Sequence, residues 1–270
     1  IKSQGVHYMS FENYKNIIDQ VAGNQLIMLN LHKDGEPLLH KKLPQIVEYA
    51  REKDVAQTIH LNTNGILINS ETGRGIIKSE IDDITISIDA AYEETYYRFK
   101  KKRGLIKLEE DIKSTLNYRD KIGSRTFIRV KIMEFDDIKK EEIDSFREKW
   151  TGIADEVQIT GIHNWSGAVD VNITDEKTSH RYPCVQLWYV LAVNSNGKVS
   201  ICNVDWDYSG IVGDVANESI KDIWNGSAIK KIRKRHLDGV WNDPVICEEC
   251  VVWVSVGNIR DYLKTRKEFL

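Results

Sequence analysis

All four cysteines of this 270-residue chain lie in its last third, and their spacing points to a shared site. Cys184 and Cys202 come first, and Cys247 and Cys250 form a C-x-x-C pair. Two thiolates so close in sequence can bind one metal or cluster from a single turn, and two more from a hairpin complete a four-sulfur site. The first residues do not read as a secretory signal, so we expect a reducing cytoplasm and interpret the quartet as a metal or cluster site rather than disulfides.

The residues between the first two cysteines predict a β-hairpin that would bring those cysteines together. Apolar residues lead up to a turn sequence at 194–197, and Val199 and Ile201 follow it. Alternating apolar residues on both sides of an Asn-Gly turn are typical of paired antiparallel strands. Further on, Ser219 is expected to cap a short helix ahead of the C-x-x-C pair.

This segment resembles the SPASM and twitch domains, which bind the auxiliary clusters of radical S-adenosylmethionine (SAM) enzymes. The family pattern of Cys, variable gap, Gly, four residues and Cys is met by Cys184, Gly197 and Cys202. A full SPASM domain has three further cysteines after the C-x-x-C pair, and this sequence has none, as in the shorter twitch form. The resemblance therefore implies one auxiliary [4Fe-4S] cluster on Cys184, Cys202, Cys247 and Cys250.

The part of the chain before the cysteines alternates between short apolar runs and segments with helical periodicity. Five runs have the length and composition of buried strands, namely residues 25–32, 58–65, 82–90, 127–133 and 155–162. Repeated strand–helix alternation predicts an α/β fold with a parallel sheet, in either a barrel or a doubly wound arrangement. The polar residues that follow the strands would then meet at one edge of the sheet, where such folds have their active sites.

Gly35 and Glu36 follow the first of these strands and are expected to bind a cofactor. A glycine lets the backbone approach a ligand, and the carboxylate beside it can pair with an ammonium group. Radical SAM enzymes have a Gly-Gly-Glu motif here that binds the methionine amino group, and Asp34-Gly35-Glu36 resembles it with Asp in place of the first glycine. The alternative is a plain turn, since Gly-Glu-Pro is a common turn sequence.

Polar residues on the next three strands are the other cofactor contacts that the resemblance implies: Asn62, Asn64, Ser87, Asp89 and Arg129. The last of these would lie near the SAM carboxylate. Some have structural alternatives. Asn64 can form a turn with Gly65, and Asp89 can cap the following helix. Lys131 points to the same side of its strand as Arg129 and can take its place.

One element of the family pattern is missing. Radical SAM enzymes bind their catalytic [4Fe-4S] cluster on a C-x3-C-x2-C loop after the first barrel strand, and no cysteine precedes Cys184 here. We therefore expect the first strand, its loop and a second, catalytic cluster to lie upstream of Ile1. On this view the 270-residue fragment is inactive by itself.

The resemblance implies two domains. Residues 1–165 would form a partial (β/α)6 radical SAM barrel that lacks its first strand, and residues 166–270 a small cluster-binding domain with a β-hairpin and helices. The boundary is expected in the polar stretch 164–182. A net charge of −3 indicates no general affinity for nucleic acid or membranes. The basic run at 230–236 is interpreted as a solvated helix face.

These inferences predict a radical SAM enzyme that forms a 5′-deoxyadenosyl radical and oxidises or otherwise modifies a small molecule or a peptide. A cluster with four cysteine ligands has no open iron, so it would transfer electrons rather than bind substrate. The resemblance also implies an electron donor of the flavodoxin or ferredoxin type. The alternative is a non-catalytic module in which the cysteines hold a structural Zn²⁺ and the rest of the chain binds a partner protein.

Overall fold

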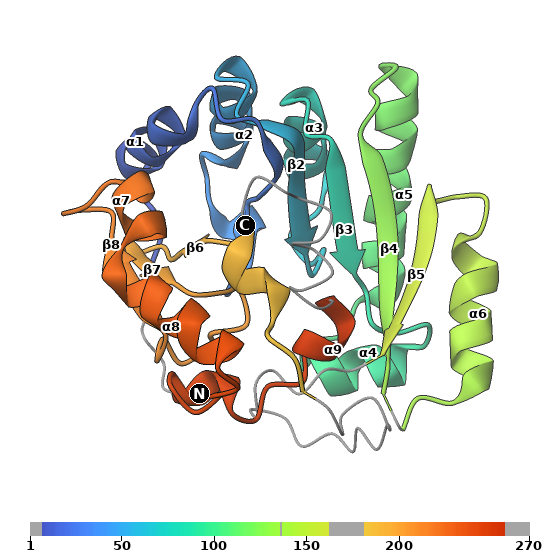
Figure 1. Ribbon diagram of the computed structural model, residues 1–270. Helices are drawn as coiled ribbons and strands as arrows, with labels where there is room; N and C mark the ends of the chain where they lie inside the picture. Colours follow the sequence, from blue (N-terminus) through green and yellow to red (C-terminus); the bar gives the residue numbers. More distant parts are fainter. Residues whose placement is uncertain (1–6, 136, 162–180, 257–270) are drawn as a thin grey trace. The chain divides into compact units, whose positions relative to one another are not determined.

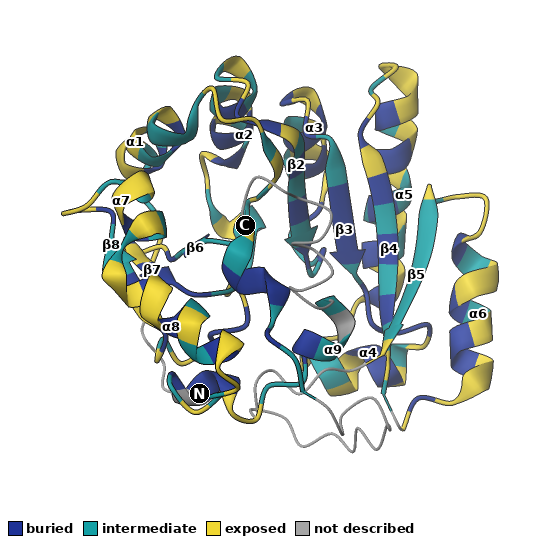
Figure 2. Ribbon diagram, viewed as in Figure 1, coloured by how far each residue is buried: buried dark blue, intermediate teal, exposed yellow. Residues whose placement is uncertain are grey.

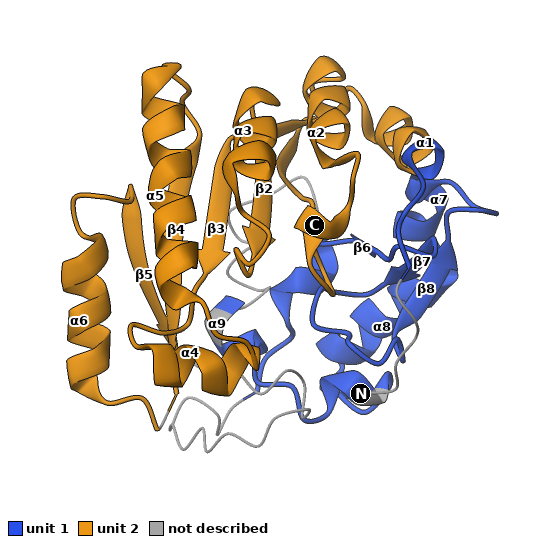
Figure 3. Ribbon diagram, turned by 180° about the vertical axis from the view of Figure 1, so that it is seen from behind, with its two compact units in different colours: residues 1–13, 163–270 blue, residues 14–162 orange. Residues whose placement is uncertain are grey.

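The computed structural model describes residues 7–135, 137–161 and 181–256 (Figure 1). The chain divides into two compact units, which are drawn in different colours in Figure 3. Residues 14–162 form the sheet unit, and residues 1–13 with 163–270 form the cysteine unit. The predicted boundary at 164–182 lies almost entirely outside the described residues, so the domain limits 1–165 and 166–270 stay a prediction.

The sheet unit is built on five parallel strands, which are β1 (Leu26–Asn30), β2 (Ala56–Thr63), β3 (Asp83–Ser87), β4 (Phe127–Glu134) and β5 (Glu156–Gly161). Their order in the sheet is the order in the chain. A doubly wound sheet reverses its strand order at a switch point, whereas the wall of a barrel does not. The structure therefore confirms the predicted α/β fold and favours the barrel arrangement.

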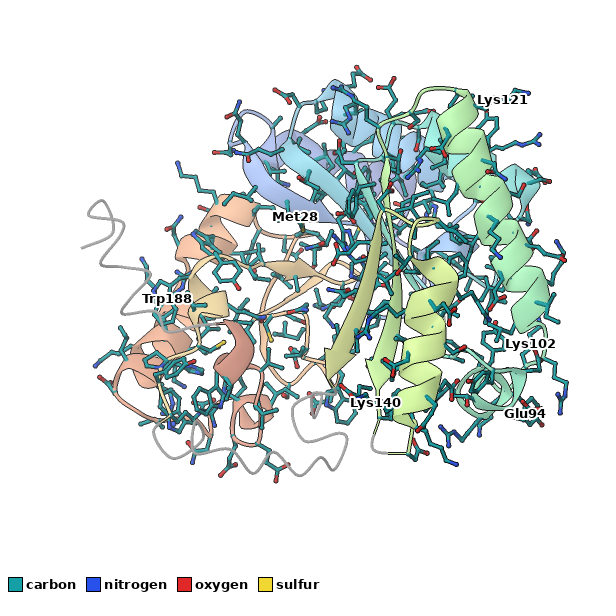
Figure 4. All side chains as sticks on the ribbon, turned by 90° about the vertical axis from the view of Figure 1, so that its right-hand side faces the viewer. Met28, Glu94, Lys102, Lys121, Lys140 and Trp188 are labelled. Carbon is teal, nitrogen blue, oxygen red and sulfur yellow. The ribbon has the colours of Figure 1, made fainter. Side chains whose placement is uncertain are left out.

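Helices cover one face of this sheet, as Figures 1 and 3 show from opposite sides. The helices of the sheet unit after β1 are the 3₁₀ helix η1 (Pro37–Leu39), α2 (Leu43–Glu52), α3 (Ser70–Lys78), α4 (Glu93–Lys100), α5 (Leu105–Lys121) and α6 (Lys140–Trp150), and α1 (Phe11–Val21) precedes the strand. Buried residues such as Val47, Ile112 and Phe146 line their inner sides (Figure 2). Of the exposed lysines labelled in Figure 4, Lys121 ends α5, Lys140 begins α6, and Lys102 lies between α4 and α5.

The other face of the sheet is polar and only partly buried. Along β2, buried Ile59 and Leu61 alternate with half-buried His60 and Asn62. Because side chains alternate between the two faces of a strand, the apolar set packs under the helices and the polar set faces the opposite way. Apolar and polar side chains alternate in the same way in β3 and β4, although Thr85 of β3 is buried. This face and the carboxyl ends of its strands are where the sheet can present polar groups to a ligand.

The turn after β2 requires glycine. Gly65 has a φ of +75°, and a Cβ atom there would lie 2.8 Å from Ile86 Cγ2 and 3.0 Å from Leu108 Cδ1. An L-residue would be strained in this conformation and would also collide with the core. The end of β2 therefore packs directly against β3 and α5.

The cysteine unit has little regular structure. Three short antiparallel strands lie in the order β6 (Ala192–Val193), β7 (Lys198–Ser200) and β8 (Ile211–Asp214). The helical segments are η3 (Val185–Trp188), α7 (Ile220–Asn225), α8 (Ser227–Leu237), η4 (Val245–Cys247) and α9 (Trp253–Val256). The predicted hairpin is β6–β7, in which Val193 pairs with Val199. Ser219 caps α7 as predicted, because its side chain accepts a hydrogen bond from the Asp222 N–H at 3.1 Å.

Candidate functional site

The four cysteines line a single cavity in the cysteine unit. Cys184 immediately precedes η3, Cys202 follows β7, Cys247 ends η4, and Cys250 lies shortly before α9. All four are free thiols. Three separate segments of the chain thus bring their sulfur atoms to one place, as the spacing predicts. The rest of the wall is mainly apolar and includes Leu187, Ile201, Val204, Ile246, Val252 and Trp253.

Burial makes these thiols poor acids unless a cation accompanies them. Desolvation raises the pKa of Cys184 to about 11 and that of Cys202 to about 12. The pKa of Cys247 is raised further, first by burial and then by the other cysteines. Thiolates would be unfavourable in this apolar setting without positive charge, and metal ions supply it. Four soft ligands in a largely apolar cavity suit an iron–sulfur cluster.

Arg181 fixes the loop that carries the C-x-x-C pair. Its guanidinium donates to the backbone carbonyl of Cys247 and, at 2.7 Å, to that of Glu248. It also lies over the ring of Trp241, 4.8 Å from the ring centroid. Burial lowers the pKa of Arg181, and the neighbouring cysteines oppose that shift. Sequence reasoning missed this residue, although an arginine three positions before the first cysteine was a visible signal.

The other polar side chain that sequence reasoning missed is His236. Residues 230–236 were expected to form a solvated helix face, and for His236 this is wrong, because it is only 1% exposed and lines the cysteine cavity. Ile229 and Ile232 are buried on the same helix. His236 lies four positions after Ile232, so helical periodicity places it on that same inner face.

In the sheet unit, Glu36 joins the ends of the first two strands. Its Oε1 accepts hydrogen bonds from the Leu38 N–H at 3.0 Å and the Thr63 hydroxyl at 2.6 Å. Its Oε2 accepts one from the Asn64 N–H at 2.8 Å. Gly35, with a φ of +90°, makes the turn that directs Glu36 there. A carboxylate has about four acceptor positions, so Oε2 can accept one more donor.

Asn62 and Ser87 meet across adjacent strands at the same edge of the sheet. The Ser87 hydroxyl donates to Asn62 Oδ1 at 3.1 Å, and the Asn62 N–H donates to His32 Nδ1 at 3.1 Å. Asn64 uses its side chain differently, because Oδ1 accepts from the Ile66 N–H at 2.9 Å and stabilises the turn. The turn interpretation therefore holds for the Asn64 side chain, while its backbone N–H binds Glu36.

Asp89 lies just beyond the end of β3 and is 5% exposed. Lys100 donates to Asp89 Oδ2 at 2.8 Å and to the Ser87 carbonyl at 3.0 Å. The alternative interpretation of Asp89 as a helix cap is wrong, since α4 begins at Glu93 and Tyr92 occupies the cap position. Asp89 instead forms a buried ion pair beside the strand ends.

Arg129 is held in ion pairs. Its guanidinium donates to Glu156 Oε2 at 2.7 Å, to Asp83 Oδ1 at 3.1 Å and to Thr85 Oγ1 at 3.0 Å. Asp83 and Glu156 are the first residues of β3 and β5, so these contacts lie toward the amino-terminal ends of the strands. Lys131, the alternative, lies next to Ser87 in the sheet register and is closer to the carboxyl ends. Burial lowers the pKa of Lys131, Asp89 opposes this shift, and Lys100 adds to it.

The cavity with four cysteines and the unreversed parallel sheet define an α/β protein with a four-thiol site that suits an iron–sulfur cluster. Comparison with known proteins agrees. The SPASM family, an iron-sulfur cluster-binding domain, matches residues 184–251. The Fe-coproporphyrin III synthase of Methanosarcina barkeri is 33% identical over 98 residues, which are 36% of this chain and 23% of that protein. The match thus spans about a quarter of that relative's length.

Two solved structures share the fold over most of the chain. BtrN in complex with AdoMet and 2-DOIA has a TM-score of 0.59 at 17% identity, covering 92% of this chain and 82% of that one. The protein anSMEcpe with bound AdoMet and Cp18Cys peptide has a TM-score of 0.64 at 13% identity, covering 94% and 81%. The chain therefore has the radical SAM fold and carries a SPASM iron–sulfur domain, which confirms the resemblance predicted from the cysteine pattern. Within the described residues, no helix is long and apolar enough to span a membrane.

Proposed function

We propose that this chain serves a radical SAM reaction on a small molecule or a peptide, in the reducing cytoplasm, with an auxiliary [4Fe-4S] cluster as an electron carrier. The main support is the convergence of Cys184, Cys202, Cys247 and Cys250 on one apolar cavity. Four thiolates occupy every iron of such a cluster, and a cluster without an open position suits electron transfer better than substrate binding. A flavodoxin- or ferredoxin-type donor would supply the electrons.

The carboxyl ends of the parallel strands are the proposed SAM site. Oε2 of Glu36 can accept a further donor, and the ammonium group of the methionine part of SAM is a donor of matching charge. Asn62 and Ser87 can bind hydroxyl groups of the ribose. Asp89 and its partner Lys100 lie beside them at the carboxyl ends of the strands. SAM, when bound and reduced, supplies the 5′-deoxyadenosyl radical, and these residues bind and orient it.

The polar face of the sheet is the proposed substrate surface. Near the carboxyl ends of the strands, Lys131 lies beside Ser87 in the sheet register, and His32 Nδ1 accepts the Asn62 N–H at 3.1 Å. Such a face suits a substrate with hydroxyl, amino or peptide groups. The BtrN structure contains 2-DOIA and the anSMEcpe structure contains a peptide, so both substrate classes are retained.

Iron analysis tests the proposal directly. After anaerobic reconstitution, we expect about four iron and four sulfide per chain and absorbance near 400 nm, the content of one [4Fe-4S] cluster. Cys202→Ser should lose most of this iron, because it removes one of four ligands. Stoichiometric zinc without iron after anaerobic purification would contradict the proposal and support the structural zinc module instead.

A further inference from the structure

One buried polar side chain beside the cysteine cavity has no part in the proposed function. His236 lines the cavity together with the four cysteines and is only 1% exposed. Neither of its ring nitrogens has a hydrogen-bond partner among the described residues. A buried polar group without a partner costs stability, commonly about 1–3 kcal/mol. Its presence therefore calls for a function.

The helix that carries His236 makes its burial more notable. The neighbouring residue, Leu237, is 46% exposed, although leucine is the more hydrophobic of the two. Ile229, Ile232 and His236 form the buried side of α8, and lysines of the same helix lie in solvent. Trp241 contacts the imidazole edge-on, with 5.1 Å between ring centroids. The fold thus buries a polar ring at a position where an apolar side chain would cost less free energy to bury.

The cavity wall offers the ring few partners. Apart from His236, its polar side chains are the cysteines, Arg181 and Gln186. The described hydrogen bonds of Arg181 go to backbone carbonyls of the C-x-x-C loop. In either protonation state an imidazole carries at least one N–H donor. The acceptors that would fill this cavity when the proposed cluster is bound are sulfur atoms.

We propose that His236 donates an N–H hydrogen bond to a sulfur of the auxiliary cluster or of its cysteine ligands and thereby raises the reduction potential of the cluster. The inference rests on the proposed function, because it requires the cluster. Reduction adds negative charge to the cluster, and a hydrogen bond to sulfur stabilises the more negative state. His236 is then a positioning and tuning residue for electron transfer rather than a ligand.

A redox titration followed by electron paramagnetic resonance tests this on the reconstituted 270-residue chain. His236→Phe should keep the iron content but make the cluster harder to reduce. We expect the equilibrium constant for reduction to fall by about tenfold or more, which lowers the reduction potential by about 59 mV for one electron. His236→Gln retains an N–H and should restore most of the wild-type potential. The control Leu187→Val trims the same cavity wall without removing a donor, so it should leave the potential nearly unchanged.

Iron is measured first, so that the two proposals can fail separately. A wild-type chain without iron contradicts the proposed function. An iron-loaded His236→Phe protein with the wild-type potential overturns only the role of His236. An equal shift in Leu187→Val also overturns it, because packing or water access would then explain the effect.

A second measurement does not depend on the folding of any variant. Protein labelled with ¹⁵N-histidine should show a weak histidine nitrogen coupling to the reduced cluster in pulsed electron paramagnetic resonance. The chain has seven histidines. Among the described residues that line the cavity, His236 is the only histidine. A wild-type cluster with no histidine coupling would overturn the inference, even if His236→Phe fails to bind iron.

Discussion

Glu36 has two roles at the strand ends that its variants can separate. It fixes the turn through three hydrogen bonds, and it is proposed to pair with the SAM ammonium group. Glu36→Gln removes the charge and should weaken SAM binding by about 1.5–3 kcal/mol, the range for a hydrogen bond to a charged group. Calorimetry with SAM measures this loss.

Thr63→Val is the matched control for that experiment. It removes the 2.6 Å hydrogen bond to Glu36 Oε1 and the 3.0 Å hydrogen bond that Thr63 Oγ1 accepts from the Gly65 N–H, but it leaves the carboxylate charged. Because the Gly65 N–H is left without this acceptor, we expect the free energy of unfolding to fall by about 1–3 kcal/mol and the SAM affinity to change little. Equal affinities for wild type and Glu36→Gln would return Gly35 and Glu36 to the status of a plain turn.

Arg129 and Lys131 should also behave differently. Arg129 pairs with Asp83 and Glu156, so Arg129→Met removes the arginine partner of both carboxylates and leaves Asp83 with His60 alone. We expect it mainly to lower stability, by about 1–3 kcal/mol after allowing for solvent screening. Lys131→Met should instead weaken SAM binding with little change in stability, if the lysine holds the SAM carboxylate.

Urea unfolding and calorimetry on the two variants decide between these residues. Loss of SAM affinity confined to Arg129→Met would assign the SAM carboxylate to Arg129 and would mean that its ion pairs rearrange on binding. Loss confined to Lys131→Met would assign the carboxylate to the residue nearer the strand ends. Unchanged affinity in both would remove β4 from the cofactor site.

At the scale of elements, the turn after β2 controls how closely the sheet packs. Gly65→Ala places a methyl group 2.8 Å from Ile86 Cγ2 in a left-handed conformation. Gly152→Ala is the control, because Gly152 has a φ of +77° and open space around its Cβ position. Both variants should lose about 1–2 kcal/mol to backbone strain, and Gly65→Ala about 1–3 kcal/mol more to overpacking. Equal urea midpoints would show that the contact relaxes freely.

The elements were largely predictable because their signals are local. The five apolar runs, the 194–197 turn and the Ser219 cap each depend on residues close in sequence, and the structure contains all of them. Ion-pair and hydrogen-bond partners on neighbouring strands were not predictable in this way, because they depend on how the strands align in the sheet. Sequence could place Arg129 and Lys131 on one face of a strand, but not the carboxylates that oppose them. The helix-cap alternative for Asp89 was wrong, because the helix begins at Glu93.

The cysteine quartet shows the same limit within one site. Spacing alone predicted that Cys184, Cys202 and the C-x-x-C pair would converge, since a hairpin and a tight turn are both local patterns. His236 carries a weaker local signal, because its spacing from Ile232 fits the inner face of a helix while a histidine in a basic run usually faces solvent. Its burial depends on how α8 packs against the rest of the cysteine unit, and this packing is visible only in the folded structure.

For the whole molecule, the two units should respond differently to removal of iron. The sheet unit has five hydrogen-bonded strands and a buried apolar core that need no metal. The cysteine unit has strands of two to four residues, and removal of iron takes away the bonds that would join its four cysteines. For sites of this kind, the free energy of metal binding is part of the free energy of folding.

Hydrogen–deuterium exchange of the reconstituted and iron-free protein checks this expectation. Peptides from residues 184–251 should exchange at least tenfold faster once iron is removed, because local opening there costs less free energy. Peptides from β2 to β5 should keep their protection and serve as the internal control. Cys202→Ser should reproduce the iron-free pattern even in the presence of iron. Uniform loss of protection across both units would mean that the cluster stabilises the entire chain as one cooperative unit.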